Sequence, residues 1–251
     1  MKISALIILA LFNICSVFAQ SPTQVFEGAN QLYQQGKFAE AAEAYETILH
    51  NGYESAELYY NLGNAYYKSG SLAKAILNYE RARRLDSTDE DLRHNLQIAN
   101  LMITDKIEAT PHLFVWDYWE GVKGAFSIKS ITWVAYGVYV LLLGSLALVI
   151  AARSFRARKL GLLSAFVSAL VLIVFVTVLV GKASDVNSRD TAIILADVTT
   201  IKNSPDAKSS DAFVLHAGVK VQITDSVSDW MKIRLADGKV GWMQKSAAEV
   251  I

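Results

Sequence analysis

The chain has 251 residues, and its 24 basic side chains balance its 24 acidic ones, so it carries no net charge at neutral pH. Nucleic-acid binding is therefore not expected, because it needs a basic surface. Hydrophobic residues make up 53% of the chain and gather in long runs, which predicts a multidomain membrane protein rather than one large soluble domain.

Residues 1–19 are predicted to be a secretory signal peptide, because a nearly continuous apolar run ends in the small residues Val17 and Ala19. An uncleaved anchor is the alternative. Either form directs the following domain across the membrane. The only cysteine, Cys15, lies inside this segment, so a mature chain would have no thiol for disulfide or metal chemistry.

Residues 20–108 contain an internal repeat with a period of 34 residues. The pattern predicts an all-α stack of two helix pairs, about 22–55 and 56–89, closed by a capping helix over 89–107, since two pairs alone would leave an apolar edge bare. Glycine suits the end of each first helix because it enters the left-handed conformation cheaply, and alanine lets neighbouring helices approach closely. The residues with these structural roles are Gly36, Ala41, Tyr45, Gly63, Gly70, Ala75 and Tyr79.

This period and these residue types resemble the tetratricopeptide repeat, and the second copy fits the pattern more closely than the first. The resemblance implies a concave groove that binds peptide or protein segments. Paired asparagines would hydrogen-bond an extended backbone and tyrosines would offer flat apolar area, whereas the alternative is that the tyrosines only pack between helices. The implied groove positions are Phe26, Asn30, Tyr33, Gln34, Tyr60, Asn64, Tyr67 and Lys68.

A clamp for a C-terminal carboxylate is not expected in this groove. Family members that have one carry basic residues at positions that are here Phe26, Tyr60, Asp91 and Asn95.

Residues 109–130 form an aromatic juxtamembrane segment that begins near Pro111 and includes Trp116, Tyr118 and Trp119. We expect a short amphipathic helix at the membrane–water boundary. An ordinary linker that happens to be aromatic is the alternative.

Two uncharged runs, 131–152 and 160–181, are each predicted to be a transmembrane helix. At about 1.5 Å per residue, each would span the roughly 30 Å hydrocarbon core of a bilayer. A buried helix pair in a soluble domain is the alternative. The connector 153–159 holds four cations and no anion, which predicts a cytoplasmic loop, and Lys182 after the second run is expected to be an interfacial anchor.

Residues 190–251 change to short alternating stretches broken by turn residues, and six strands in this length predict a small closed all-β barrel. Asp237-Gly238 is a hairpin signal. The segment resembles bacterial SH3-like domains, which bind cell-wall peptides or dock proteins, and the resemblance places the tryptophans in or near the core rather than on a ligand platform. The positions that carry it are Gly218, Trp230, Gly238, Gly241 and Trp242.

We expect no catalytic site, metal or cofactor. Each of the four histidines lacks a second His or Cys at metal-ligand spacing. They are His50, His94, His112 and His216.

The whole order of segments resembles the BatE-type proteins of the Bacteroides aerotolerance group. The resemblance implies a non-enzymatic scaffold in the bacterial inner membrane with both flanking domains periplasmic, acting in aerotolerance or envelope stress. The implied partners are the lipid bilayer and other envelope proteins, including membrane-anchored von Willebrand A-domain proteins. A cell-wall sensor that binds peptidoglycan through the SH3-like domain is the alternative.

Overall fold

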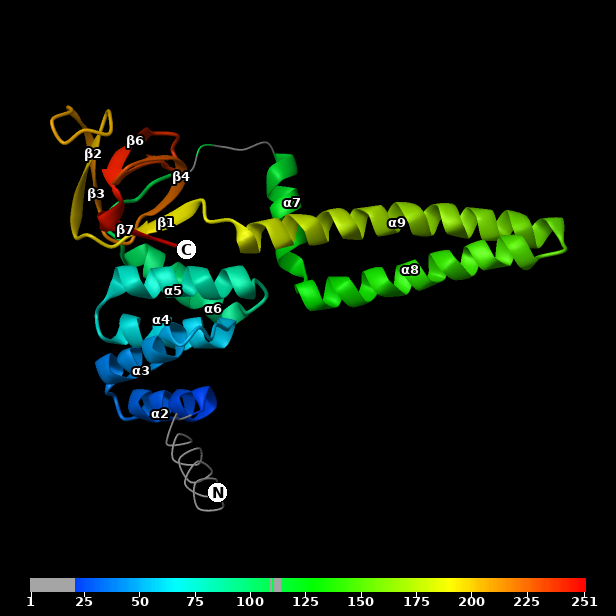
Figure 1. Ribbon diagram of the computed structural model, residues 1–251, viewed down its shortest axis with the longest axis horizontal. Coiled ribbons are helices and arrows are strands. Elements are labelled where there is room, and N and C mark those ends of the chain that lie inside the picture. Colours follow the sequence, from blue (N-terminus) through cyan, green and yellow to red (C-terminus); the bar gives the residue numbers. More distant parts are fainter. Residues whose placement is uncertain (1–20, 109, 111–113) are drawn as a thin grey trace, which may run out of the picture.

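The computed structural model describes residues 21–108, 110 and 114–251. The predicted signal peptide lies outside the described residues. The described chain forms a stack of helices, a long helical stalk and a β-domain (Figure 1). The stack comprises α2 (Pro22–Gln34), α3 (Phe38–His50), α4 (Ala56–Lys68), α5 (Leu72–Leu85) and α6 (Glu90–Met102).

Short-range hydrogen bonds set the ends of the helices in the stack. The side chains of Ser21, Ser55 and Asp89 cap α2, α4 and α6 by accepting a hydrogen bond from the backbone three residues later. Gly36 and Gly70, with φ of 78° and 83°, supply the left-handed residue that ends α2 and α4. The capping helix α6 ends at Met102 rather than at 107, because the chain then turns to pack against the β-domain.

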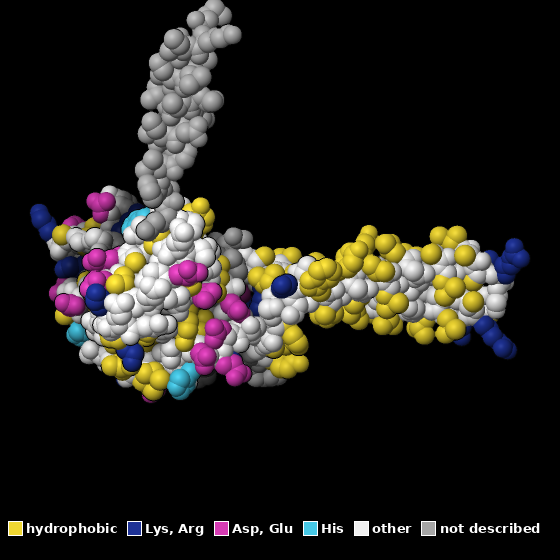
Figure 2. Space-filling model, turned by 90° about the horizontal axis from the view of Figure 1, so that it is seen from below, with side chains coloured by type: hydrophobic (Ala, Val, Ile, Leu, Met, Phe, Trp, Pro, Cys, Tyr) yellow, Lys and Arg dark blue, Asp and Glu magenta, His cyan; other side chains and the backbone are white. Residues whose placement is uncertain are grey.

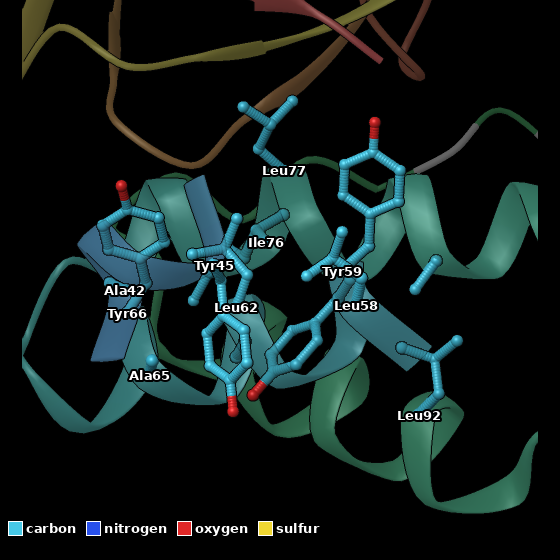
Figure 3. Packing of buried hydrophobic residues seen from close by; sticks show 14 of the residues in the cluster. Ala42, Tyr45, Leu58, Tyr59, Leu62, Ala65, Tyr66, Ile76, Leu77 and Leu92 are labelled. Carbon is cyan, nitrogen blue, oxygen red and sulfur yellow. The ribbon is translucent and has the colours of Figure 1, made fainter. Parts of the chain in front are cut away.

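The core of the stack lies between the helix pairs (Figure 3). Tyr45 and Tyr79 are each 1% exposed, and Ala41 and Ala75 are fully buried at close helix contacts. Gly63 lies against Tyr79 so closely that a Cβ atom there would be 2.6 Å from Cδ1 of the ring. The period of 34 residues thus places matching residues at matching helix contacts.

The stalk is a helical hairpin of α8 (Ile128–Ala151) and α9 (Phe155–Asn187), preceded by the short helix α7 (Phe114–Ala125). Both long helices are long and apolar enough to cross a membrane. Only 11% of the apolar stretch of α8 and 17% of that of α9 are buried, whereas a core helix of a soluble protein is mostly buried. Figure 2 shows apolar side chains along the stalk and basic ones at its free end. Because α9 already begins at Phe155, most of the predicted connector is helical.

The β-domain is one antiparallel sheet in the order β3-β2-β6-β5-β4-β1-β7. Its interior side chains form a single cluster to which β1 through β6 contribute, so the sheet curls around one core. Its edge strands are β3 and β7, so the hydrogen-bonded closure predicted for a barrel is not found between these described strands. The seventh strand was not predicted. The strands are β1 (Thr191–Ile194), β2 (Val198–Lys202), β3 (Asp211–His216), β4 (Lys220–Val227), β5 (Trp230–Arg234), β6 (Val240–Gln244) and β7 (Ala248–Val250).

Candidate protein-binding groove

Asn64, predicted to contact a ligand, is already engaged inside the stack. Its side-chain oxygen Oδ1 accepts a hydrogen bond from the hydroxyl of Tyr79 on α5 at 2.7 Å and another from Nδ2 of Asn95 on α6 at 3.0 Å. A carbonyl oxygen has two lone pairs, and both are used here. The oxygen therefore joins three helices and is not free to accept from a bound peptide.

The same arrangement occurs one repeat earlier. Oδ1 of Asn30 accepts hydrogen bonds from the hydroxyl of Tyr45 and, at 3.3 Å, from Nδ2 of Asn61. Tyr45 and Asn61 each stand 34 residues before the corresponding donor to Asn64, which is Tyr79 on α5 or Asn95 on α6. In both asparagines the side-chain oxygen is therefore an acceptor inside the stack. Only the amide nitrogen Nδ2 of each asparagine can bind the backbone of a peptide, as was expected of the whole side chain.

The aromatic groove residues pack between the helices on their inner side. Phe26 lies 5.7 Å from Tyr45 between ring centroids, and Tyr60 lies 6.1 Å from Tyr79. Burial raises the pKa of Tyr45 to about 12, with smaller contributions from nearby Tyr33 and Glu57. The Tyr60 hydroxyl also accepts a hydrogen bond from Asn95 at 3.0 Å. Phe26 and Tyr60 are nevertheless only partly buried, so their outer edges remain available.

The open part of the groove lies nearer the ends of the first helices. Gln34 and Lys68 are exposed, and Tyr33 and Tyr67 are partly exposed. Burial raises the pKa of Tyr33, with a further contribution from Tyr60, so its hydroxyl stays protonated at physiological pH.

Sequence reasoning missed the contribution of α6. Continuing the 34-residue register one step further places Ile98, Leu101 and Met102 in line with the groove positions of α4, and their exposed fractions are 36%, 69% and 58%. The hydroxyl of Tyr67 lies 3.2 Å from Sδ of Met102. These four side chains form one apolar patch, which we call the apolar end of the groove. The register itself was the signal that could have found it.

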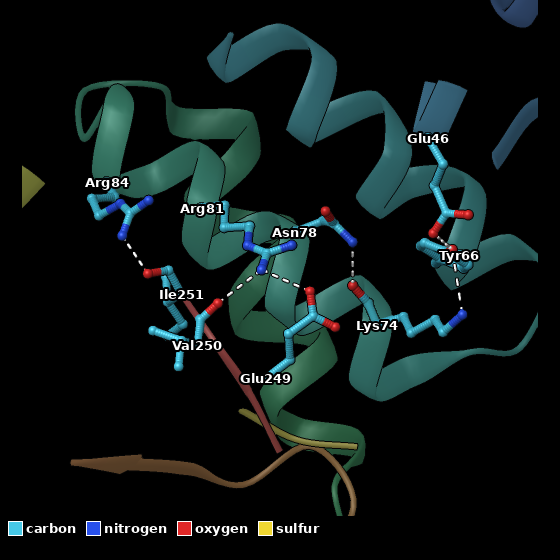
Figure 4. Close-up of polar contacts among 9 residues, drawn as sticks. All are labelled: Glu46, Tyr66, Lys74, Asn78, Arg81, Arg84, Glu249, Val250 and Ile251. Carbon is cyan, nitrogen blue, oxygen red and sulfur yellow. Dashed lines mark hydrogen bonds and ion pairs between the residues drawn. The ribbon is translucent and has the colours of Figure 1, made fainter. Parts of the chain in front are cut away.

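The β-domain docks on α5 through an ionic cluster centred on one buried glutamate. Glu80, whose side chain is 8% exposed, pairs with Lys220 of β4 at 2.9 Å and with Arg83 at 2.6 Å. Burial alone would raise the pKa of Glu80, but the two cations outweigh it and hold the pKa below its ordinary value. Arg81 and Arg84 also bind the C-terminal residues of the β-domain (Figure 4).

Apolar contacts complete this docking. Ile193 and Ile251 of the β-domain are buried in the core cluster of the helical stack. Gly218, at φ 94°, allows the close approach, because a Cβ atom there would lie 2.6 Å from Cγ2 of Ile103. Gly238 has φ 88° in the predicted hairpin turn. Gly241 passes so close to β2 that a Cβ atom there would be 3.1 Å from the Lys202 carbonyl oxygen.

The two tryptophans of the β-domain, expected in or near its core, are partly buried and are not among the side chains of its interior cluster. On β5, Met231 and Ile233 point inward, so Trp230, one residue earlier, points outward. Trp242 on β6 is likewise partly exposed, and Nζ of Lys232 lies 5.8 Å from its ring centroid. Both tryptophans therefore belong to the outer face of the sheet.

Among the described residues, no group of three or more His, Cys, Asp and Glu side chains could hold a metal ion. His50 and His94 are exposed. His216 pairs with Asp105 at 3.0 Å, where the chain leaves α6 and crosses the β-domain. His112 lies outside the described residues.

The comparisons with known families match two of these parts. The family described as "Tetratricopeptide repeat" matches residues 26–90, and the family described as "Bacterial SH3 domain" matches residues 197–249. The predicted presence of both kinds of domain is confirmed. No curated protein matches the chain. Domains of both kinds generally mediate protein interactions, and bacterial SH3 domains also suggest cell-wall binding.

Proposed function

We propose that the protein is a non-enzymatic, membrane-anchored scaffold whose repeat groove binds a segment of another protein. The observation that carries this proposal is the row of side chains left open at the ends of α2, α4 and α6. Gln34, Lys68, Leu101 and Met102 are exposed at groove positions of a repeat family that binds peptides. They combine polar groups with the apolar end of the groove, which suits an extended segment with at least one large apolar side chain.

The arrangement of the domains supports a membrane anchor with both flanking domains on one side. The stack and the β-domain lie at the same end of the stalk and contact each other (Figure 1). The opposite end carries Arg153, Arg156, Arg158 and Lys159. The positive-inside rule places that end in the cytoplasm, so we place both domains in the periplasm, with the stalk across the bacterial inner membrane.

Site-specific photo-crosslinking in the intact membrane tests the groove. A photoreactive residue at Lys68 should give adducts that disappear when Leu101→Asp is added, because a charge in the apolar end removes the docking site. The control is the same photoreactive residue at Glu43, which is exposed on α3. Asn30 and Asn64 should not be varied here, because their oxygens hold the stack together. Equal adducts from both positions, or none from Lys68, would contradict the proposal.

Cysteine labelling tests the orientation. An impermeant maleimide should react with Lys208→Cys of the β-domain in cells whose outer membrane is permeable, and with Arg156→Cys only after lysis. Labelling of Arg156→Cys in intact cells would refute the periplasmic placement.

The resemblance of the whole chain to BatE-type proteins extends the proposal to a partner and a process. We propose membrane-anchored von Willebrand A-domain proteins as occupants of the groove, with a role in aerotolerance or envelope stress. The adducts formed at Lys68 would identify the partner by mass spectrometry, and a cytoplasmic partner would exclude this extension.

Cell-wall binding through the β-domain is a second candidate, favoured by the outward position of Trp230 and Trp242. Partly exposed rings beside a cation such as Lys232 are suited to stacking on a ligand. The protein should then co-sediment with purified peptidoglycan, and Trp242→Ala should abolish this. If the wild-type protein does not co-sediment, cell-wall binding is excluded and the scaffold role is the only candidate function left.

A further inference from the structure

A cavity of about 990 Å³ lies where the helical stack, the stalk and the β-domain meet. It is bounded by the end of α5, the end of α7, the start of α8, the end of α9 and the β-domain. The stalk begins at this point, so in the proposed membrane orientation the cavity faces the outer surface of the bilayer. Its lining includes Arg84, Lys129 and Lys182.

Lys182 is the most unusual of these cations. The residue is only 8% exposed, and its ammonium group donates to three neutral oxygens: Oγ of Ser87 at 3.2 Å, and the carbonyls of Lys123 at 2.5 Å and Phe126 at 2.8 Å. It therefore caps the C-terminal end of α7, and its expected role as an interfacial anchor stays a prediction. No Asp or Glu carboxylate among the described side chains binds this ammonium group directly, although Asp86 and Asp185 lie close enough to favour its charge. Burying a charge is costly, so a bound anion would stabilise it further.

Two further cations of the lining have no Asp or Glu side chain as an ion-pair partner among the described side chains. Arg84 donates to the backbone carbonyl of Ser188 and to the main-chain oxygen of Ile251, the last residue of the sequence, and its Nε atom is buried without a hydrogen-bond partner. Lys129 is exposed at the start of α8. Among the side chains that the structure describes, no Asp or Glu carboxylate lies within ion-pair distance of Arg84, Lys129 or Lys182.

The carboxylates that line the cavity are mostly engaged elsewhere. Glu80 binds Arg83 and Lys220, so this trio of two cations and one anion keeps a positive charge. Asp185 binds Lys123 at 2.7 Å. Asp86 accepts hydrogen bonds from the backbone N–H and the hydroxyl of Thr88. Only Asp190 is exposed and without such a role among the described carboxylates of the lining.

We propose that this cavity binds a phosphate group, and that its source is the headgroup of an anionic phospholipid in the outer leaflet. Three cations that form no ion pair with a described Asp or Glu side chain line it, and the N-terminus of the 24-residue helix α8 adds backbone N–H groups at its positive dipole end. Basic pockets beside transmembrane helices bind lipid headgroups by the same chemistry. The choice of a lipid source rests on the proposed membrane anchor, whereas the phosphate chemistry does not.

The test uses the full-length protein in neutral detergent, with bound lipid counted by native mass spectrometry. Phosphatidylglycerol should bind more tightly than phosphatidylcholine, whose choline cation neutralises its phosphate. Lys129→Gln should weaken phosphatidylglycerol binding about tenfold, the usual scale for a charge-assisted hydrogen bond. Lys129 is exposed and should be dispensable for folding. The matched control is Lys208→Gln, an equal loss of charge on the β-domain, which should change nothing.

A parallel thermal-shift titration with inorganic phosphate separates the two sources. Stabilisation by phosphatidylglycerol and only weak stabilisation by inorganic phosphate are expected. Equally strong stabilisation by inorganic phosphate alone would overturn the lipid source and keep the phosphate site. Equal binding of the two lipids without a phosphate effect, or equal weakening by both variants, would overturn the site itself. Crosslinks at Lys68 are unaffected by any of these results, so the scaffold proposal stands or fails separately.

Discussion

Replacing Asn64 with alanine should loosen the helical stack even when the groove is empty. The substitution removes two hydrogen bonds, from Tyr79 at 2.7 Å and from Asn95 at 3.0 Å. Each contributes about 1 kcal/mol, and a buried hydroxyl left without an acceptor costs about 1 to 3 kcal/mol. Tyr79 is 1% exposed, so water cannot replace the lost partner. We therefore expect the local free energy of unfolding to fall by about 2 to 3 kcal/mol.

Hydrogen–deuterium exchange of peptides from α4 and α5 measures this local stability. A loss of that size corresponds to amide exchange about 30- to 150-fold faster. Tyr79→Phe removes one donor and leaves the asparagine, so it should cost about 1 kcal/mol, and the double variant should cost less than the sum of the two. Lys68→Ala is the control, because this exposed residue lies one turn further along α4.

The reasoning fails if Asn64→Ala exchanges no faster than Lys68→Ala. The oxygen would then not be a structural acceptor, and Asn64 would be better assigned to ligand binding.

Three other predictions concern stability. Gly63→Ala would place a methyl group 2.6 Å from a buried tyrosine ring and should cost about 1 to 3 kcal/mol, whereas Gly28→Ala, with no neighbour within 4 Å, should be neutral or stabilising in thermal unfolding. Because the pKa of Glu80 is lowered in the folded protein, its carboxylate stabilises the fold at pH values above the ordinary glutamate pKa of 4.5, and this stabilisation is lost as the pH falls through the lower pKa of the folded state. Glu80→Gln should remove this part of the pH dependence of the melting temperature. In denaturant unfolding, Trp242→Ala should lower the free energy of unfolding by under about 1 kcal/mol and Met243→Ala by about 2 to 5 kcal/mol, because only the methionine side chain is buried. Equal losses would show that the tryptophan belongs to the core.

The sequence predicted the helical stack well because a 34-residue period repeats whole contacts. Gly36 and Gly70 had to end helices, and Tyr45 and Tyr79 had to meet equivalent neighbours. Their packing follows from local conformation and residue size, both of which a sequence displays. What each asparagine oxygen accepts depends on two other helices, so the position of Asn64 was predictable and its engagement was not.

The β-domain shows where a resemblance outweighed a local pattern. Met231 and Ile233 on β5 and Leu235 just after it alternate and are all buried, and this period of two already places Trp230 on the opposite face. The family resemblance had placed the tryptophans in or near the core, without saying which face of the sheet they occupy. The short strand β7 was missed because three residues carry too little alternation to be recognised.

The docking of the two domains had no sequence signal at all. Glu80 and Lys220 are 140 residues apart, and each alone resembles an ordinary surface charge. Only the tertiary fold brings them together beside Ile193 and Ile251.

This docking determines which side of the stack remains open to partners. The β-domain covers part of α5, and Lys182 of the stalk donates to Ser87 just beyond that helix. The stack is thus held from two directions at its α5 end, next to the proposed membrane surface. Neither attachment involves the groove residues of α2 and α4, whereas Met102 at the end of α6 borders a pocket that the β-domain also lines. A partner bound along α2 and α4 would leave the β-domain and the stalk in place, as the proposed scaffold requires.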